Sequence, residues 1–311
     1  MYSVAPRAGH DPIKDHMRNN DTGAGESTCP ICGSSKAFSE YIEWQTHRWV
    51  LCRDCGGGHK EPYIPETEDT LIVEDRYDLD YFETEFFARR RKFAENQAEW
   101  LRRNFQDGMA VVELGPGLGL AAARFLEMLP GTPYHAVEPY STFSEFIAKQ
   151  LGDRVVMHTG DPERGLEDAL REASAGGRAV LVYMDNVLEH LAGPHKFIGG
   201  LKAKLPKGSR ALIDVPNERG LKYRTRIYAA IGGQTTMAPG HINLFTAKSF
   251  GTMLTRHGLR HKVHQRGIRR REEVNCLPEG PALDVVLGLL RVFPVDSLLG
   301  IANNLRVEVE F

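Results

Sequence analysis

The chain has 311 residues, of which 41% are hydrophobic, and its formal net charge is −2. That length holds one large domain and one small domain, with enough apolar side chains for a sizeable core. A chain so close to neutral has no overall attraction to nucleic acid or to an acidic membrane surface, so a polyanionic partner would need a local basic patch. No apolar stretch is long enough to span a bilayer.

Residues 1–27 lack hydrophobic periodicity and contain charges, prolines and a run rich in Asn and Gly. Such a segment cannot bury enough apolar surface to fold, which predicts a disordered tail. It carries no apolar signal segment either. We therefore expect a cytoplasmic location.

Two Cys-x-x-Cys pairs follow the tail, Cys29 with Cys32 and Cys52 with Cys55. In a reducing compartment this spacing indicates one tetrahedral Zn²⁺ site, because each pair offers two thiolates from one turn and a hairpin brings the turns together. Two disulfides or redox-active pairs are the alternatives.

The segment between the pairs predicts strands at 41–44 and 47–51, so residues 28–60 form a zinc-ribbon-like module. A few dozen residues cannot bury a core without the metal. Prolines and acids at 63–75 form a connector. The zinc-binding module and its connector are thus expected to span residues 28–74.

From residue 75 to 311 the chain predicts a second, larger domain that begins with an amphipathic helix at 78–105. Strands are expected at 109–114, 133–138, 154–158, 179–184 and 209–215, and helices beginning near 118, 141, 163, 194 and 221. A helix at 246–257 and strands at 260–266 and 305–311 follow, and the apolar segment 283–299 is expected to pack against the domain rather than lie on a membrane surface. This alternation predicts a Rossmann-like α/β fold, a doubly wound sheet of seven strands with ligands at the carboxyl ends.

The first predicted strand ends in a glycine-rich turn, Glu113-Leu-Gly-Pro-Gly-Leu-Gly119. Gly115, Gly117 and Gly119 tolerate positive φ and let a ligand approach the free amides at the next helix, although plain packing of strand against helix is an alternative. Glu138 ends the second strand about twenty residues later, where such folds place an acid for ribose hydroxyls. The Gly-x-Gly-x-Gly spacing differs from that of dinucleotide sites and favours S-adenosylmethionine.

Four segments now lie in order: residues 113–119, 137–139, 160–161 and 186–190. Together they resemble the signature segments of class I S-adenosylmethionine-dependent methyltransferases over roughly residues 77–270. The resemblance implies that the glycines lie near the methionine part of the cofactor and Glu138 at the ribose. It also implies that Asp161 reaches the adenine amino group and that Asn186 lies beneath the sulfonium. Glu113 belongs to the same cofactor-binding set, and Tyr81 is expected either to close over the cofactor or to join the core.

Glu189 and His190 follow the fourth strand, where a methyl acceptor would meet the cofactor. His190 can remove a proton near neutral pH, and Glu189 can orient it or hold a substrate hydroxyl. His241 is a candidate second base. The alternatives are that the pair only holds its loop, and that His241 is satisfied by backbone groups.

A Glu-His pair after the fourth strand is catalytic in sugar C-methyltransferases with a leading four-cysteine module, and Glu189-His190 is similar. The leading hypothesis is therefore methylation of a small-molecule acceptor, a sugar, nucleotide-sugar or other secondary metabolite. Methyltransferases of exocyclic base nitrogens carry an Asn/Asp-Pro-Pro-Tyr/Phe segment after the fourth strand, and this chain has Asp185-Asn-Val-Leu188 there instead. This difference argues against methylation of a nucleobase amino group. The second hypothesis is a ribosomal or transfer RNA methyltransferase, with partial support from Trp44, His47, Arg48, Trp49 and Lys60. The third is a non-catalytic zinc-dependent interaction protein with a vestigial cofactor fold.

Overall fold

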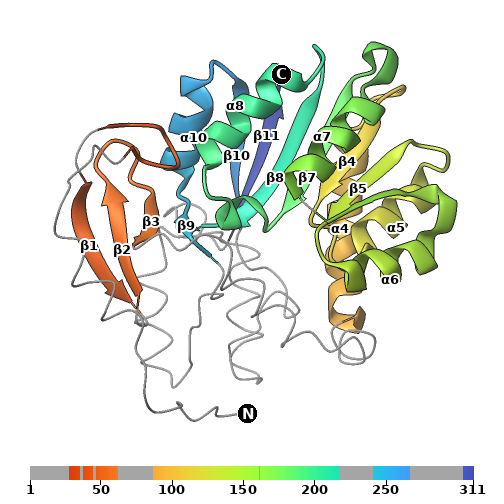
Figure 1. Cartoon of the computed structure of the whole chain (residues 1–311), viewed down its shortest axis with the longest axis horizontal. Coiled ribbons are helices and arrows are strands. Elements are labelled where there is room, and N and C mark those ends of the chain that lie inside the picture. The colour runs from red at the N-terminus through yellow and green to blue at the C-terminus, as the bar shows by residue number, and fades with distance from the viewer. Residues whose placement is uncertain are drawn as a thin grey trace, which may run out of the picture.

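The computed structural model describes residues 28–35, 38–44, 47–61, 87–160, 162–217, 241–266 and 304–311. Its larger part is built on a sheet of seven strands in the order β10-β11-β8-β7-β4-β5-β6 (Figure 1). The strands are β4(Ala110–Leu114), β5(Tyr134–Glu138), β6(Val156–Thr159), β7(Val180–Asp185), β8(Arg210–Pro216), β10(Arg260–Arg266) and β11(Asn304–Glu310). The predicted Rossmann-like α/β fold is confirmed, and each strand begins and ends within two residues of its predicted limits.

Strands β4 to β8 are mutually parallel, and β11 lies antiparallel between β8 and β10. The last two strands were predicted from sequence, and the antiparallel register of β10 with β11 joins Val263 to Val307. Strands β4 and β5 are buried along their whole length, as expected for parallel strands covered on both faces. Strand β11 alternates between buried and partly exposed residues. It therefore belongs nearer the edge of the sheet.

The helices divide over the two faces of this sheet, so that two apolar cores form. One core joins α4(Phe87–Asn104), α5(Leu120–Met128) and α6(Ser141–Leu151) to the sheet through residues such as Leu101, Phe125 and Ile147. The other joins α7(Pro162–Ala173), α8(Pro194–Lys204) and α10(Ala247–Arg256) through Leu170, Ile198 and Phe250. This second core also contains the four cysteines. The four-cysteine module, called the zinc module below after the metal that its sequence predicts, therefore continues the core of the larger domain.

The zinc module has a sheet of its own, in the order β1-β2-β3-β9 (Figure 1). Strands β1(Phe38–Trp44) and β2(His47–Cys52) were predicted. Strand β3(Gly58–Glu61) was not predicted, and neither was β9(Asn243–Leu244), which comes from the larger domain, between β8 and α10. β9 pairs antiparallel with β3, joining Gly58 to Leu244 and His59 to Asn243. The module is therefore completed by a strand of the larger domain.

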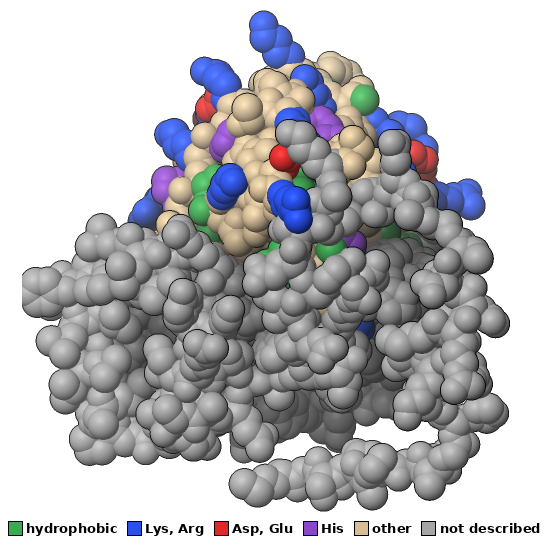
Figure 2. Space-filling model, turned by 90° about the vertical axis from the view of Figure 1, so that its left-hand side faces the viewer, with side chains coloured by type: hydrophobic (Ala, Val, Ile, Leu, Met, Phe, Trp, Pro, Cys, Tyr) green, Lys and Arg blue, Asp and Glu red, His purple; other side chains and the backbone are tan. Residues whose placement is uncertain are grey.

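Figure 2 shows the end of the molecule that carries this module. Over the described part of that face, Lys and Arg side chains stand among Asp, Glu and His side chains, and apolar side chains form only small separate patches. Two residues that would favour contact with RNA, Trp49 and Lys60, are 2% and 7% exposed. They are therefore not available as a stacking and charge platform.

Several predictions from sequence fall outside the described residues. These are the tail 1–27, the connector, the start of the first helix with Tyr81, Asp161, the helix near 221 and the segment 283–299. Within the described part of the chain, no helix combines the length and the apolar character that crossing a membrane requires.

Candidate active site and zinc module

The glycine loop between β4 and α5 adopts the backbone that its sequence predicts. Gly115, Gly117 and Gly119 have φ of 64°, 54° and 66°, values that side chains with a Cβ rarely adopt. A Cβ on Gly115 would lie 2.7 Å from Val187, and one on Gly119 would lie 3.0 Å from Ile147, so both glycines also serve packing. A Cβ on Gly117 would meet no described atom within 4 Å. Gly117 is thus the point of the loop that a ligand can approach.

Glu138 ends β5 beside this loop and holds it through its carboxylate. Its Oε2 accepts from the Gly117 amide at 3.3 Å, and its Oε1 accepts from the Tyr140 amide at 3.2 Å. Burial raises the pKa of Glu138 to about 7, although these two backbone donors favour the charged form. The carboxyl group therefore changes charge in the neutral range when no cofactor is bound.

Glu113 lies one strand away but is oriented differently. It is buried, and its Oε2 accepts from the Tyr134 hydroxyl at 2.7 Å. Burial raises its pKa to about 8, and the charges of Asp185 and Glu138 act in the same direction. This hydrogen bond connects β4 to β5 near the glycine loop, so Glu113 stabilises the strands that carry the loop.

Asn186 follows β7 and has φ of 54°, the one positive φ among described residues other than glycine. Its amide donates to the Asp214 carbonyl at 2.9 Å, and its side-chain nitrogen donates to Asp185 at 3.2 Å. Left-handed residues with a side chain are uncommon, and they cluster at functional sites. Strand β7 thus ends in a strained turn, on the side of the sheet where the carboxyl ends of the parallel strands and the glycine loop lie.

Two further polar residues of this edge were not predicted from sequence. Asp185 accepts a short hydrogen bond from the Gln97 side chain, which ties α4 to the end of β7. Gln97 is buried on a helix whose inward face is otherwise apolar. A glutamine on the apolar stripe of the first predicted helix was the signal that could have identified it.

A second cluster joins Glu189, His190 and His241. Glu189 and His190 lie on the 3₁₀ helix η4(Leu188–His190), directly after the turn at Asn186. His241 Nε2 lies 3.7 Å from Glu189 Oε1, and the rings of His190 and His241 meet edge to face with centroids 4.9 Å apart. The structure therefore brings together all three residues that the sequence suggested for acid–base chemistry.

Burial lowers the pKa of His241 to about 3, and the charge of His190 acts in the same direction. A group with so low a pKa is neutral near pH 7 and is a weak base. His190 is therefore the better candidate to accept a proton, and His241 is placed to orient Glu189 and His190.

The backbone that carries His241 is fixed from both sides. The Ile242 amide donates to the Glu189 carbonyl at 3.0 Å, while the Ile242 carbonyl accepts from the Lys60 amide at 2.9 Å. The Asn243 side chain donates to the Leu191 carbonyl at 2.7 Å. One short strand thus connects the zinc module to the loop of Glu189 and His190.

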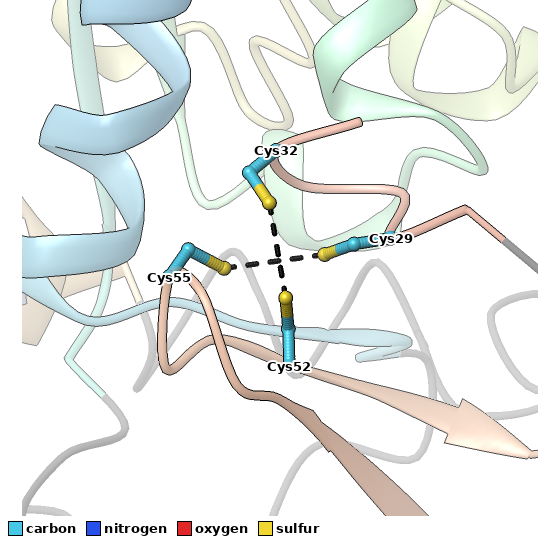
Figure 3. A group of neighbouring side chains, drawn as sticks. All are labelled: Cys29, Cys32, Cys52 and Cys55. Carbon is cyan, nitrogen blue, oxygen red and sulfur yellow. Dashed lines mark hydrogen bonds between the residues drawn. The ribbon is translucent and has the colours of Figure 1, made fainter. Parts of the chain in front are cut away.

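The four cysteine sulfurs point toward a common centre (Figure 3). Cys29 and Cys55 Sγ are 4.0 Å apart, and Cys32 and Cys52 Sγ are 3.8 Å apart. A tetrahedral Zn²⁺ with Zn–S bonds of about 2.3 Å requires sulfurs ~3.8 Å apart. All four thiols are free of disulfides. The donor set fits a closed structural zinc site.

The two knuckles repeat one backbone pattern. The Gly33 amide donates to the Cys29 carbonyl at 2.7 Å, and the Gly56 amide donates to the Cys52 carbonyl at 2.8 Å. Both glycines have positive φ, 71° and 72°, a backbone that residues with a Cβ rarely adopt. The Gly57 amide also points at Cys55 Sγ, at 3.3 Å. Backbone donors of this kind stabilise thiolates.

The thiols by themselves do not all ionise. The hydrogen bond with Cys55 lowers the pKa of Cys29 to about 5, and the same pairing together with burial raises the pKa of Cys55. Burial raises the pKa of Cys32 to about 11. A divalent cation among the sulfurs would deprotonate them outright, because its charge dominates the local field.

The zinc module is anchored to the larger domain through Arg256. This side chain donates to the Cys32 carbonyl at 2.6 Å and pairs with Asp54 at 3.2 Å. The His195 amide at the start of α8 donates to the Pro30 carbonyl at 3.0 Å. The first knuckle thus rests on α8 and α10.

Residues 86–265 match the family described as Methyltransferase domain, which covers more than half of the chain. The chain belongs to this methyltransferase family. Together with the topology of the sheet, the match identifies a class I S-adenosylmethionine-dependent enzyme, as the sequence predicted. Among curated proteins, none matches the chain.

Solved structures of other methyltransferases are similar to this one. A SAM-dependent methyltransferase from Archaeoglobus fulgidus has a TM-score of 0.48 at 15% identity, over 73% of this chain and 99% of that one. The plantazolicin methyltransferase BpumL, in complex with a monoazolic desmethylPZN analogue and SAH, has a TM-score of 0.45 at 12% identity, over 78% and 90%. An S-adenosylmethionine-dependent methyltransferase from Mesorhizobium loti has a TM-score of 0.43 at 14% identity, over 70% and 100%.

Proposed function

We propose that this methyltransferase transfers the methyl group of S-adenosylmethionine to a small-molecule acceptor, a sugar, nucleotide-sugar or other secondary metabolite. The observation that carries the proposal is the cluster of Glu189, His190 and His241. Glu189 and His190 come just after the turn at the end of β7, and His241 joins them from the segment before β9. A carboxylate beside two imidazoles suits an acceptor that has hydroxyl groups and must lose a proton.

The cofactor would lie over the glycine loop, along the carboxyl ends of β4, β5 and β7. The open space at Gly117 supports a position for the methionine part, and Glu138 would accept from the ribose hydroxyls. Asn186 would lie under the sulfonium. Asp161 and Tyr81 lie outside the described residues. Their proposed roles are that Asp161 binds the adenine amino group and that Tyr81 closes over the cofactor. The intact loop and Glu138 argue against a vestigial fold.

His190 would act as the base. Bound S-adenosylmethionine would supply the methyl group as an electrophile to the acceptor atom. The acceptor's proton passes to an imidazole nitrogen of His190, and the imidazolium is stabilised by the nearby Glu189 carboxylate. His241, neutral and buried, would hold Glu189 in place.

Four thiolates would hold one Zn²⁺ with no open position, so the metal would have a structural role. The module would instead complete the acceptor site, because β3 pairs with β9, which begins two residues after His241. Cysteine ligation would thereby fix the position of a side chain that belongs to the active site.

Loss of the Glu138 carboxylate is expected to weaken cofactor binding. Glu138→Ala should lose ~1–3 kcal/mol of binding free energy, because ribose hydroxyls would lack their acceptor. Calorimetric titration with S-adenosylmethionine measures this directly. An unchanged affinity would place the ribose elsewhere.

Cofactor affinity should also depend on pH through the same group. The ionised carboxylate accepts ribose hydrogen bonds, and the pKa of Glu138 is raised to about 7 by burial. Affinity should therefore be greatest above pH 7 and fall as pH decreases from about 7 to 5, by at most about tenfold per unit. Glu138→Gln is the matched control, since it keeps the shape and should remove this dependence.

The acceptor class is tested by supplying radiolabelled S-adenosylmethionine with nucleotide-sugars in one series and with ribosomal or transfer RNA in another. Transfer to nucleotide-sugars or related metabolites is expected. Transfer only to RNA would contradict the proposal. Burial of Trp49 and Lys60 removes two of the residues on which the RNA hypothesis depended.

A further inference from the structure

A third group of potential metal ligands lies outside both sites described above. His135 on β5 and His158 on β6 face the same side of the sheet, and Glu172 comes from α7, which covers that side. His135 pairs in register with Val156, so His158 lies two residues farther along the neighbouring strand. The parallel pairing of β5 with β6 therefore places the two imidazoles next to each other.

The distances suit a shared cation. His135 Nδ1 and His158 Nε2 are 3.1 Å apart, and each lies 3.9 Å from Glu172 Oε2. Ligand atoms at bonds of about 2.0–2.1 Å from one Zn²⁺ lie ~2.9–3.4 Å apart, depending on the angle. The nitrogens already meet this spacing. Glu172 would need to move by less than about 1 Å, and its side chain is 46% exposed.

We infer that His135, His158 and Glu172 form a second, open metal site that binds a divalent transition ion such as Zn²⁺ or Ni²⁺. Two imidazoles and one carboxylate are a donor set that such ions accept, with water at the remaining positions. The ion would link β5, β6 and α7.

The surrounding groups are compatible with this site. Burial lowers the pKa of both His135 and His158, a shift in the direction of the neutral imidazole, which is the form that binds metals. The charge of Arg171 would oppose a cation, but Arg171 pairs with Asp168 at 2.5 Å and lies 3.8 Å from the other oxygen of Glu172. Glu172 thus has one oxygen toward the arginine and one toward the histidines.

A second histidine pair shows what distinguishes the proposed site. His195 and His257 also have ring nitrogens 3.0 Å apart. Among the described residues, however, no carboxylate completes that pair to a group of three ligands. Contacts of His257 Nε2 with the His195 ring and with the His195 carbonyl, both at 3.0 Å, account for that pair. A hydrogen bond between His135 and His158 does not by itself account for the carboxylate at equal distances from both rings.

The test is a metal titration of the full chain whose cysteine site is already loaded with one Zn²⁺. Calorimetry should detect a second equivalent of Zn²⁺ or Ni²⁺, and Co²⁺ should give visible bands without the charge-transfer absorption of thiolates. Glu172→Gln changes a half-exposed side chain and should lower the affinity for the second equivalent at least about tenfold, as should His158→Gln. Glu167→Gln, on the same helix but paired with Lys204, is the matched control and should not change it.

Wild-type protein that binds only the first equivalent would overturn the inference. So would a second equivalent that survives in both Glu172→Gln and His158→Gln. Because the readout is metal binding and not methyl transfer, either result would leave the proposed enzyme function untouched.

Discussion

Replacing His190 with alanine is expected to lower turnover by ~10²–10⁴-fold while the affinity for S-adenosylmethionine stays within about twofold. General-base catalysis acts only on the transition state, so its loss lowers kcat without weakening cofactor binding. Steady-state kinetics with a true acceptor, together with calorimetric titration of the cofactor, measures both quantities.

His241→Asn is the matched variant for this prediction. The pKa of His241, lowered to about 3, makes this side chain a weak base. Replacing His241 should therefore lower turnover less than replacing His190 does. At saturating S-adenosylmethionine, where the pH dependence of cofactor binding does not contribute, the fall in kcat toward low pH should persist in His241→Asn and disappear in His190→Ala. If both variants keep full turnover, the reaction needs only alignment of an acceptor that is already nucleophilic. A large loss of cofactor binding in His190→Ala would instead support a purely structural role for Glu189 and His190.

The Cys52→Ser variant is expected to lose one tightly bound Zn²⁺ and to unfold the zinc module at residues 28–60. Structural Zn²⁺ contributes apparent binding free energies of ~10–16 kcal/mol in small modules, far more than this module can obtain from its own core. Metal analysis and proteolysis of the purified variant would reveal both effects. Cys276→Ser, a thiol outside the two pairs, serves as the control and should keep the metal.

Loss of this metal should also disturb the structure of the acceptor site, while the cofactor site should stay intact. β3 pairs with β9, and Ile242 bonds to both Lys60 and Glu189, so the unfolded module would release the segment of His241. The glycine loop follows β4, and Glu138 ends β5. Both are held by the hydrogen bond from the Gly117 amide to Glu138 and make none of these contacts with the zinc module. Turnover should therefore fall while cofactor affinity is kept. Metal-free protein with unchanged stability would contradict the zinc assignment, and unchanged turnover would contradict the proposed role of the module.

Much of the fold follows from local properties of the sequence. The buried run Ala110–Leu114 is apolar except for Glu113 and contains two β-branched residues, so it forms a strand in a context that covers both faces. Gly115, Gly117 and Gly119 fix the turn because left-handed backbone is costly for other residues. The spacing of the cysteines also determines the two knuckles, because each turn is completed within a few residues. Periodicity, turn chemistry and ligand spacing are all short-range signals.

Contacts between distant segments were decided by the tertiary structure alone. β9 has only the two residues Asn243 and Leu244, too few for any periodic pattern, and it becomes a strand only because β3 presents a free edge to it. The position of His241 beside Glu189 follows from that pairing. Likewise, His135 and His158 meet Glu172 only because β5 and β6 pair in one register and α7 packs over them. The order and register of strands depend on interactions across the whole sheet, which a local pattern of residues does not encode.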